Sequence, residues 1–328
     1  MKHDEEAPLL DVSELSVRFP TAGGDLSALD DVSVALGRGT TLGIVGESGS
    51  GKSILARTIL GLLPRKARIT SRHINFAGEN LATLGSAAMR PIRGRRIAMV
   101  FQDPMTSLNP VRTIGSQLAE GMITHLGVSR AVANRRALDL LKRVGVTAPE
   151  RRIEQYPHEL SGGMRQRVVI AMAIACEPEL LIADEPTTAL DVTVQAEVLA
   201  LLRGLQQEQH MAMILITHDL GVAAGYTDEI AVMYAGQIVE RAPTRDLLRT
   251  PRMPYTQALL GSIPRLDMPA HVRLSVIPGR PTTIYGDVEQ CRFAQRCELR
   301  TEICLHKKPA LSVIDGGRIY RCWNPIVP

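Results

Sequence analysis

The stretch TTLGIVGESGSGKS, residues 40–53, decides the fold of this chain. It opens with a compact apolar run that ends in glycine, as a buried parallel strand does. The following GESGSGKS fits the pattern G-x-x-x-x-G-K-[ST] and leads into a helical run that begins at Ile54. Strand, glycine-rich loop and helix in this order predict a binding site for a nucleoside triphosphate.

This loop supplies several kinds of phosphate ligand. Gly46, Gly49 and Gly51 let backbone N–H groups turn inward around phosphate oxygens, and the following helix N-terminus adds partial positive charge. We expect Lys52 to contact the β- and γ-phosphates and Ser53 to ligate Mg²⁺. The predicted nucleotide-binding residues of the loop are Gly46, Glu47, Ser48, Gly49, Ser50, Gly51, Lys52 and Ser53.

Other parts of the chain predict further strands. LSVRF (15–19) and LDDVSVAL (29–36) alternate apolar and polar residues around a glycine-rich turn, so we expect an antiparallel pair. LLIAD (180–184) and MILIT (213–217) are compact apolar runs that resemble the strand before the loop. Buried strands separated by helical patterns indicate an α/β domain with a mostly parallel sheet.

Two acidic residues follow one of these strands directly. Asp184 stands at the C-terminal end of LLIAD, where it can hold Mg²⁺ through water. Glu185 comes next, where a general base would polarise the attacking water, an effect worth on the order of 10²–10⁴ in rate. Together they predict hydrolysis of the bound nucleotide.

Two more polar residues follow apolar strand-like runs. His218 ends LITHD at the C-terminal edge of the predicted sheet, where open α/β folds bind ligands, so we expect it to contact the γ-phosphate. Gln102, in MVFQDP, is a candidate contact for Mg²⁺ and the water; the alternative is an ordinary polar loop residue.

The segment from about 104 to 175 predicts a largely helical insertion. Within it SRAVANRRALDLLKRVG (129–145) begins at a predicted N-cap, Ser129, and stops at Gly145. The apolar positions at helical spacing are Val132, Leu138, Leu141 and Val144.

A second helix N-terminus that is suited to bind phosphate is predicted in LSGGMRQRVVIAMAIA, residues 160–175. Ser161, Gly162 and Gly163 precede a helix whose apolar positions include Val168. The chain already has one complete phosphate loop. The second phosphate-binding segment is therefore expected to bind a nucleotide that is held by a different subunit.

At this point the chain resembles the ATP-binding-cassette (ABC) ATPases. LSGGMRQR is similar to their signature, and it follows the phosphate loop and FQDP and precedes ADEP and THD in the family's order. The resemblance implies an ABC-type nucleotide-binding domain for ATP and Mg²⁺, with a P-loop core sheet, an N-terminal antiparallel β subdomain and a helical insertion. It also implies adenine stacking by Phe19, whose alternative is a core aromatic, and a dimer-interface position for Asp191 in TALD.

The resemblance narrows to the ATPase subunits of oligopeptide, dipeptide and nickel importers. FQDPMTSLNP, QYPHELSGGMRQR, TTALDVTVQAE and PRMPYTQALLGSIP (251–264) are similar to that group, with Met253 in place of its His. The resemblance implies a peripheral subunit on the cytoplasmic face of the cell membrane that powers solute uptake by ATP-driven dimer closure. Its expected partners are two membrane-spanning permease subunits, a second, non-identical ATPase subunit and, indirectly, an extracytoplasmic solute-binding protein.

The chain is expected to divide near residue 240, where Pro and Gly become frequent and periodicity fades. We predict an ATPase domain over 8–240 and a small cysteine-rich C-terminal domain over 241–328. Four of the five cysteines lie in that second part: Cys291, Cys297, Cys304 and Cys322.

These four cysteines have the spacing C-x₅-C-x₆-C-x₁₇-C. Structural zinc sites usually include a close C-x₂₋₄-C pair, which is missing here, whereas four thiolates are the usual complement of a [4Fe–4S] cluster. The pattern resembles one that binds such a cluster in the importer family, although Gln290 and Gln295 depart from it. Zinc and unligated thiols stay open as alternatives. Cys176 is expected to be a small buried apolar residue.

Composition narrows the function classes. Lys+Arg exceeds Asp+Glu by only 38 to 34, without a long basic run, so we expect no nucleic-acid partner. MKHDEEAPLL lacks a signal-peptide core, and runs such as VVIAMAIA are short of the roughly 20 residues of a membrane span, so a cytosolic chain is expected.

Peptide import is the leading prediction, with nickel or another small solute as the alternative. A soluble ABC ATPase acting on nucleic acid or ribosomes is disfavoured because such proteins usually carry tandem cassettes or coiled-coil insertions. An exporter usually fuses a membrane domain to its cassette. An iron–sulfur redox enzyme would leave the ATPase motifs unexplained.

Overall fold

The computed structural model describes residues 7–188, 190–263 and 277–327. Ala189 of the TALD segment and Pro264, the last residue of the 251–264 segment, therefore lie outside the described residues. The chain forms two compact units, which we describe separately. The first comprises Met1–Gly37, Thr41–Thr83 and Ile216–Pro328, and the second comprises Arg38–Thr40 and Leu84–Leu215.

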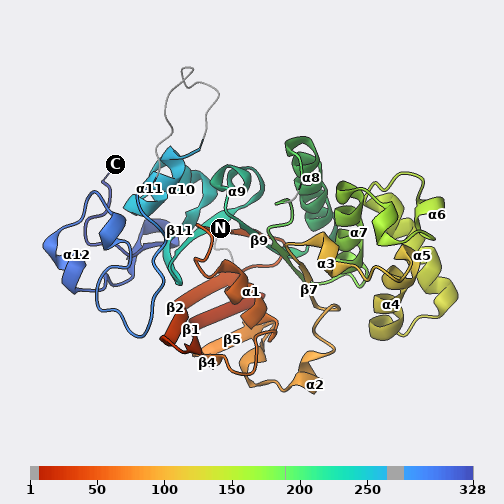
Figure 1. Ribbon diagram of the computed structural model, residues 1–328, viewed down its shortest axis with the longest axis horizontal. Helices are drawn as coiled ribbons and strands as arrows, with labels where there is room; N and C mark the ends of the chain where they lie inside the picture. Colours follow the sequence, from red (N-terminus) through yellow and green to blue (C-terminus); the bar gives the residue numbers. More distant parts are fainter. Residues whose placement is uncertain (1–6, 189, 264–276, 328) are drawn as a thin grey trace, which may run out of the picture. The chain divides into compact units, whose positions relative to one another are not determined.

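The first unit contains an antiparallel sheet formed mainly by two long strands. β1 (Leu10–Thr21) pairs with β2 (Gly24–Leu36) in antiparallel register, with Val17 opposite Leu29. This confirms the predicted pair. On the other side of β1, β4 (Arg68–Thr70) and β5 (His73–Phe76) pair with it (Figure 1), and β6 (Glu79–Asn80) pairs with β5.

A second group of strands in this unit carries the phosphate loop. β3 (Thr41–Val45) is buried at every residue, as its apolar run predicts, and pairs in parallel with β10 (Glu229–Tyr234). Outward from β10 the order is β11 (Gln237–Pro243), β13 (Arg318–Tyr320) and β12 (Ser312–Ile314), all antiparallel. The helices of this unit are α1 (Lys52–Ile59), α9 (Leu220–Tyr226), α10 (Thr244–Arg249), α11 (Pro254–Gly261) and α12 (Glu302–His306).

One apolar cluster joins the C-terminal residues to the strands of the first unit. Tyr234 of β10, Tyr255 of α11 and Phe293 pack with ring centroids 4.6–5.2 Å apart. Cys291 and Cys304 are buried in the same cluster. Because the helices and strands described within residues 277–327 are all short, this shared core positions that part of the chain. The separate cysteine-rich domain and the boundary near residue 240 stay predictions.

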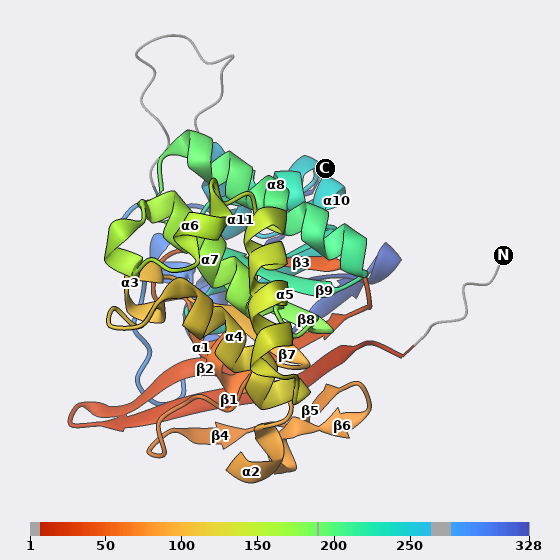
Figure 2. The same cartoon turned by 90° about the vertical axis from the view of Figure 1, so that its right-hand side faces the viewer.

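The second unit combines buried strands with most of the long helices. β8 (Leu180–Asp184) and β9 (Ala212–Thr217), whose last two residues belong to the first unit, are buried at every residue, and β7 (Ile97–Val100) pairs in parallel with β8. Figure 2 shows helices α4, α5 and α7 close together. The helices are α2 (Ser86–Met89), α3 (Pro104–Ser107), α4 (Ile114–Leu126), α5 (Arg130–Arg143), α6 (Pro149–Arg152), α7 (Gly162–Ile174) and α8 (Val192–Gln209).

The helix predicted between Ser129 and Gly145 is present as α5, and its boundaries are as expected. The Ser129 hydroxyl accepts the N–H of Val132, and Gly145 adopts the left-handed conformation that ends the helix. The predicted apolar face was partly wrong, because Val132 is 37% exposed. Leu141 and Val144 are buried as predicted, and the helix also buries Ala133 and Ala137. Small alanines at i and i+4 let another helix approach closely, and a count of large apolar residues overlooks them.

Candidate functional site

The phosphate loop lies between β3 and α1, and its backbone has little room for side chains. A Cβ added to Gly46 would lie 2.1 Å from the carbonyl oxygen of Met233. Gly51, the N-cap of α1, has φ of 106°, which other residues rarely adopt. The N–H of Gly236 also donates to the carbonyl of Ser50 at 2.9 Å. The glycines of the sequence pattern are therefore required by close approach and by backbone conformation.

Lys52 lies inside the loop. Its side chain is almost fully buried, and Nζ donates to the carbonyl oxygens of Gly46 at 2.7 Å and Glu47 at 3.0 Å. An ammonium group enclosed by loop carbonyls places a positive charge at the centre of the loop. Ser53 follows it in the first turn of α1. This arrangement is suited to an anionic phosphate chain.

Glu47 binds two C-terminal residues that were not predicted from the sequence, Arg296 and Tyr255. Its carboxylate receives Arg296 Nη1 at 2.6 Å and Nη2 at 2.9 Å, and its N–H donates to the Tyr255 hydroxyl at 3.0 Å. The hydrogen bond and charge of Glu47 hold the pKa of Arg296 above its ordinary value. Only the position of Arg296 beside a cysteine, in RC, hinted at this role.

In the second unit, Glu185 follows the buried Asp184 at the end of β8 and has a positive φ of 47°. Glu185 Oε2 accepts Gln102 Nε2 at 3.0 Å and the Thr188 hydroxyl at 2.9 Å. The structure thus brings together two of the predicted catalytic residues and adds Thr188, which sequence reasoning missed. Both amide and hydroxyl orient the carboxylate that is expected to act as the base.

The starts of α7 and α8 lie side by side in the same unit. Ser161 caps α7 by accepting the N–H of Met164 at 3.4 Å, and Asp191 caps α8 by accepting the N–H of Val194 at 3.0 Å. A Cβ on Gly163 would lie 2.9 Å from Val194 Cγ1, so this contact requires glycine. The two helix N-termini therefore lie against each other, each capped by a polar side chain.

The two remaining predicted nucleotide contacts lie in the first unit. Phe19 is half-buried on β1 opposite Leu26 of β2. His218 is exposed after β9, and the next residue, Asp219, caps α9 by accepting the N–H of Gly221 at 2.7 Å. The cap fixes the turn that follows His218.

The cysteine region, residues 291–322, gathers four cysteines from across its length. The N–H of Cys291 donates to the carbonyl of Cys304 at 2.9 Å, and Cys297 and Cys322 pack against the same apolar cluster. Burial raises the pKa of Cys291 to about 11 and that of Cys322 to about 12, and the neighbouring cysteines add to both increases. Cys176 is buried elsewhere, as expected. Within the described residues, no three His, Cys, Asp or Glu side chains converge closely enough for one metal ion.

Comparison with known proteins shows the family. Residues 29–188 match the ABC transporter family, and residues 239–304 match the C-terminal region of oligopeptide/dipeptide transporters. The dipeptide transport ATP-binding protein DppD of Bacillus subtilis is 46% identical over 96% of this chain and 94% of its own. That of Haemophilus influenzae is 48% identical over 97% and 96%. The chain belongs to the ABC transporter family.

Solved structures of ABC cassettes agree with this assignment. The cassette MJ0796, in a dimeric post-hydrolysis state bound to ADP and Pi, matches with a TM-score of 0.65 and 28% identity. That match covers 72% of this chain and 99% of the cassette. The predicted ABC nucleotide-binding fold is confirmed, and this ABC protein is an ATPase. Among its described residues, no helix has the length and apolar character needed to cross a membrane.

Proposed function

We propose that this ABC ATPase powers the uptake of di- and oligopeptides. The observation that carries the proposal is near full-length similarity to dipeptide transport ATP-binding proteins, including the C-terminal region that gives the oligopeptide/dipeptide family its description. The subunit acts on the cytoplasmic face of the cell membrane with two permease subunits and a second, non-identical ATPase subunit. An extracytoplasmic solute-binding protein delivers the peptide to the permeases.

Each residue that is predicted to contact the nucleotide has a role in this proposal. Glu185 activates the attacking water, and its hydrogen bonds to Gln102 and Thr188 support this role because they orient the carboxylate. Lys52 binds the β- and γ-phosphates from inside the loop, and Phe19 stacks on adenine. The residues assigned to Mg²⁺ are Ser53, Gln102 and Asp184, and His218 contacts the γ-phosphate.

The N-termini of α7 and α8 serve the partner ATPase subunit. Ser161, Gly162 and Gly163 bind the nucleotide held by the partner's phosphate loop, and Asp191 lies in the dimer interface. The N-terminus of α7 supports this role, because a helix start with Ser161 as its cap and glycines in its first turn favours an anionic phosphate.

The cysteine region holds a [4Fe–4S] cluster in this proposal, through Cys291, Cys297, Cys304 and Cys322. A cluster carries its irons at separate corners, so its four thiolates need not converge on one point as ligands of a single ion do. The fit rests on a donor set of four sulfurs in one place: Cys291 and Cys304 are joined by a backbone hydrogen bond and buried in one apolar cluster, and Cys297 and Cys322 pack against that cluster. When bound, the cluster would cross-link a region that has few regular elements.

Iron and acid-labile sulfide in the anaerobically purified protein test the cluster. We expect both in the native chain, and a loss of both in Cys304→Ser. Cys176→Ser is the matched control, because that cysteine is equally buried and lies outside the cysteine region. Stoichiometric zinc, or thiols without metal in the native chain, would contradict the cluster and leave the ATPase assignment intact.

Uptake of a labelled short-peptide mixture tests the transported solute, with nickel uptake measured in parallel. Cells with Glu185→Gln should lose peptide uptake and keep nickel uptake. Glu208→Gln is the control, since Glu208 pairs with Arg143 at 2.8 Å on an exposed part of α8. Unchanged peptide uptake with lost nickel uptake would show that peptides are the wrong solute.

A further inference from the structure

Three arginines of the cysteine region are each adjacent to a cysteine in the sequence. They are Arg292, Arg296 and Arg321, and the side chain of each is at most 7% exposed. Each forms an ion pair with an acidic residue from the first fifty residues of the chain. The pairs are Arg292 with Asp30 at 2.8 Å, Arg296 with Glu47 at 2.6 Å, and Arg321 with Asp31 at 2.6 Å.

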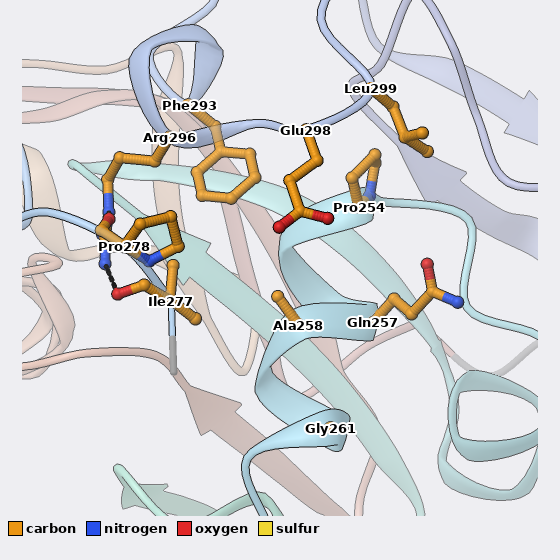
Figure 3. Close-up of a pocket in the computed structure, with 10 residues that line it drawn as sticks. All are labelled: Pro254, Gln257, Ala258, Gly261, Ile277, Pro278, Phe293, Arg296, Glu298 and Leu299. Atoms are coloured by element: carbon orange, nitrogen blue, oxygen red, sulfur yellow. Dashed lines mark hydrogen bonds between the residues drawn. The ribbon is translucent and has the colours of Figure 1, made fainter. Parts of the chain in front are cut away.

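Arg296 differs from the other two because its partner belongs to the phosphate loop. Arg296 Nη1 donates to Glu47 Oε2 and Nη2 donates to Glu47 Oε1. Lysine cannot reproduce this directional geometry of two parallel hydrogen bonds. Nε donates to the carbonyl of Pro278 at 2.7 Å, and Figure 3 shows Arg296 beside Pro278 and Ile277. The guanidinium also lies 5.7 Å from the centroid of the Tyr234 ring. These contacts orient the guanidinium independently of its ion pair with Glu47.

Glu47 is held at three points. Arg296 binds its carboxylate, Tyr255 accepts its N–H at 3.0 Å, and its carbonyl accepts Lys52 Nζ at 3.0 Å. Two of these three contacts come from residues more than 200 positions away in the sequence. The third reaches the lysine that is expected to bind the phosphates. A displacement of Glu47 therefore moves a ligand of the Lys52 ammonium.

We propose that Arg296 is a positioning residue for ATP binding. It holds Glu47 so that the loop keeps the shape in which Lys52 and the backbone N–H groups bind phosphate. The C-terminal region thus contributes to nucleotide affinity without touching the nucleotide. Attachment of the C-terminal region to the rest of the unit is not enough to affect nucleotide affinity. Arg321 also anchors this region, but it binds Asp31 on β2 and not the phosphate loop.

Substitution of Arg296 should not overpack its surroundings. A cavity of about 360 Å³ adjoins it, lined also by α11 and Phe293 (Figure 3). A shorter side chain leaves space that water can enter. Substitution of Arg296 therefore acts mainly by removing its two hydrogen bonds to the Glu47 carboxylate.

The experiment compares Arg296→Gln, Arg296→Lys and the control Arg321→Gln in the full chain. ATP affinity is measured by equilibrium binding of labelled ATP, and stability by thermal unfolding of the same samples. We expect Arg296→Gln to weaken ATP binding by about tenfold, Arg296→Lys by less, and Arg321→Gln to lower stability with unchanged affinity. In the assembled transporter, Arg296→Gln should raise KM for ATP and leave kcat nearly unchanged.

A double-mutant cycle with Glu47→Gln gives the sharper test. If Arg296 and Glu47 act through one ion pair, the ATP affinity of the double variant should be no lower than that of the single variant with the lower affinity. Additive losses would overturn the proposal, because Arg296 would then act on affinity by another route. Unchanged ATP affinity in a folded Arg296→Gln variant would overturn it as well.

Discussion

The phosphate loop and the cysteine region acquire their shapes in different ways. The loop is contiguous, and its own motif supplies the glycines and Lys52, which binds carbonyls only five and six residues away. The regular structure of the cysteine region consists of α12, two three-residue strands and two three-residue 3-10 helices, and buried arginines tie the region to distant carboxylates. A short motif can therefore encode the first, whereas the second depends on partners that the chain brings from far away.

The two regions nevertheless meet at Glu47, which belongs to the loop and binds Arg296. A change at the base should affect nucleotide chemistry and spare stability, whereas a change that disturbs the packing of the loop should also cost stability. Changes in the cysteine region should affect stability first and nucleotide chemistry only through that contact.

The largest expected effect is that of Glu185→Gln. The amide keeps the shape of the side chain but cannot accept a proton, so ATP hydrolysis should fall by about 100-fold or more while ATP binding is retained. Phosphate release from the assembled transporter and binding of labelled ATP measure the two properties. Glu208→Gln provides the baseline, and near-normal turnover in Glu185→Gln would refute the assignment of the base.

Gly46→Ala should have the next largest effect. The added methyl group would meet the Met233 carbonyl at 2.1 Å, so the loop must shift, at a cost of about 1–3 kcal/mol in the free energy of unfolding. ATP binding should weaken along with stability. Gly49→Ala is the matched control in the same loop: no atom lies within 4 Å of its added Cβ, and only its positive φ opposes the change. Equal losses in both variants would show that close packing does not shape the loop.

Cys297→Ser should lower the stability of the C-terminal region by roughly 1–3 kcal/mol without abolishing ATP hydrolysis. Limited proteolysis followed by mass spectrometry would locate the loss, and phosphate release would measure the retained activity. Because Arg296 precedes Cys297, a modest rise in KM for ATP is expected. A folded variant without any ATPase activity would contradict the view that the region mainly stabilises the chain.

The smallest effect concerns the pH dependence of the Asp30 anchor. Burial raises the pKa of Asp30, but the hydrogen bond from Lys308 and the charge of Arg292 outweigh it, so the folded pKa lies below the ordinary 3.8. The stabilising contribution is then present above that value and is lost as pH falls through the folded pKa. Native chain and Asp30→Asn should differ in unfolding midpoint at pH 6, and the difference should shrink at more acidic pH. A constant difference would exclude a role for ionised Asp30.

Much of the fold was predictable because local rules dominate it. Compact apolar runs predicted β3, β8 and β9, and Ser129 predicted the start of α5. The exposure of Val132 was not predictable, because helical spacing does not say which of two apolar stripes meets a neighbour. Thr188 was missed for a related reason: its hydroxyl becomes significant only when the turn after β8 brings it to Glu185.

The sequence alone determined that the chain has a phosphate loop, an ABC signature and an acidic base in the family's order, because these motifs are short and their conformations are set by neighbouring residues. It also identified the cysteines by their number and spacing. Only the tertiary structure decided that Arg296 and Tyr255 hold Glu47, 249 and 208 residues away. A buried ion pair between such distant residues depends on how the whole unit packs, and no local pattern encodes that.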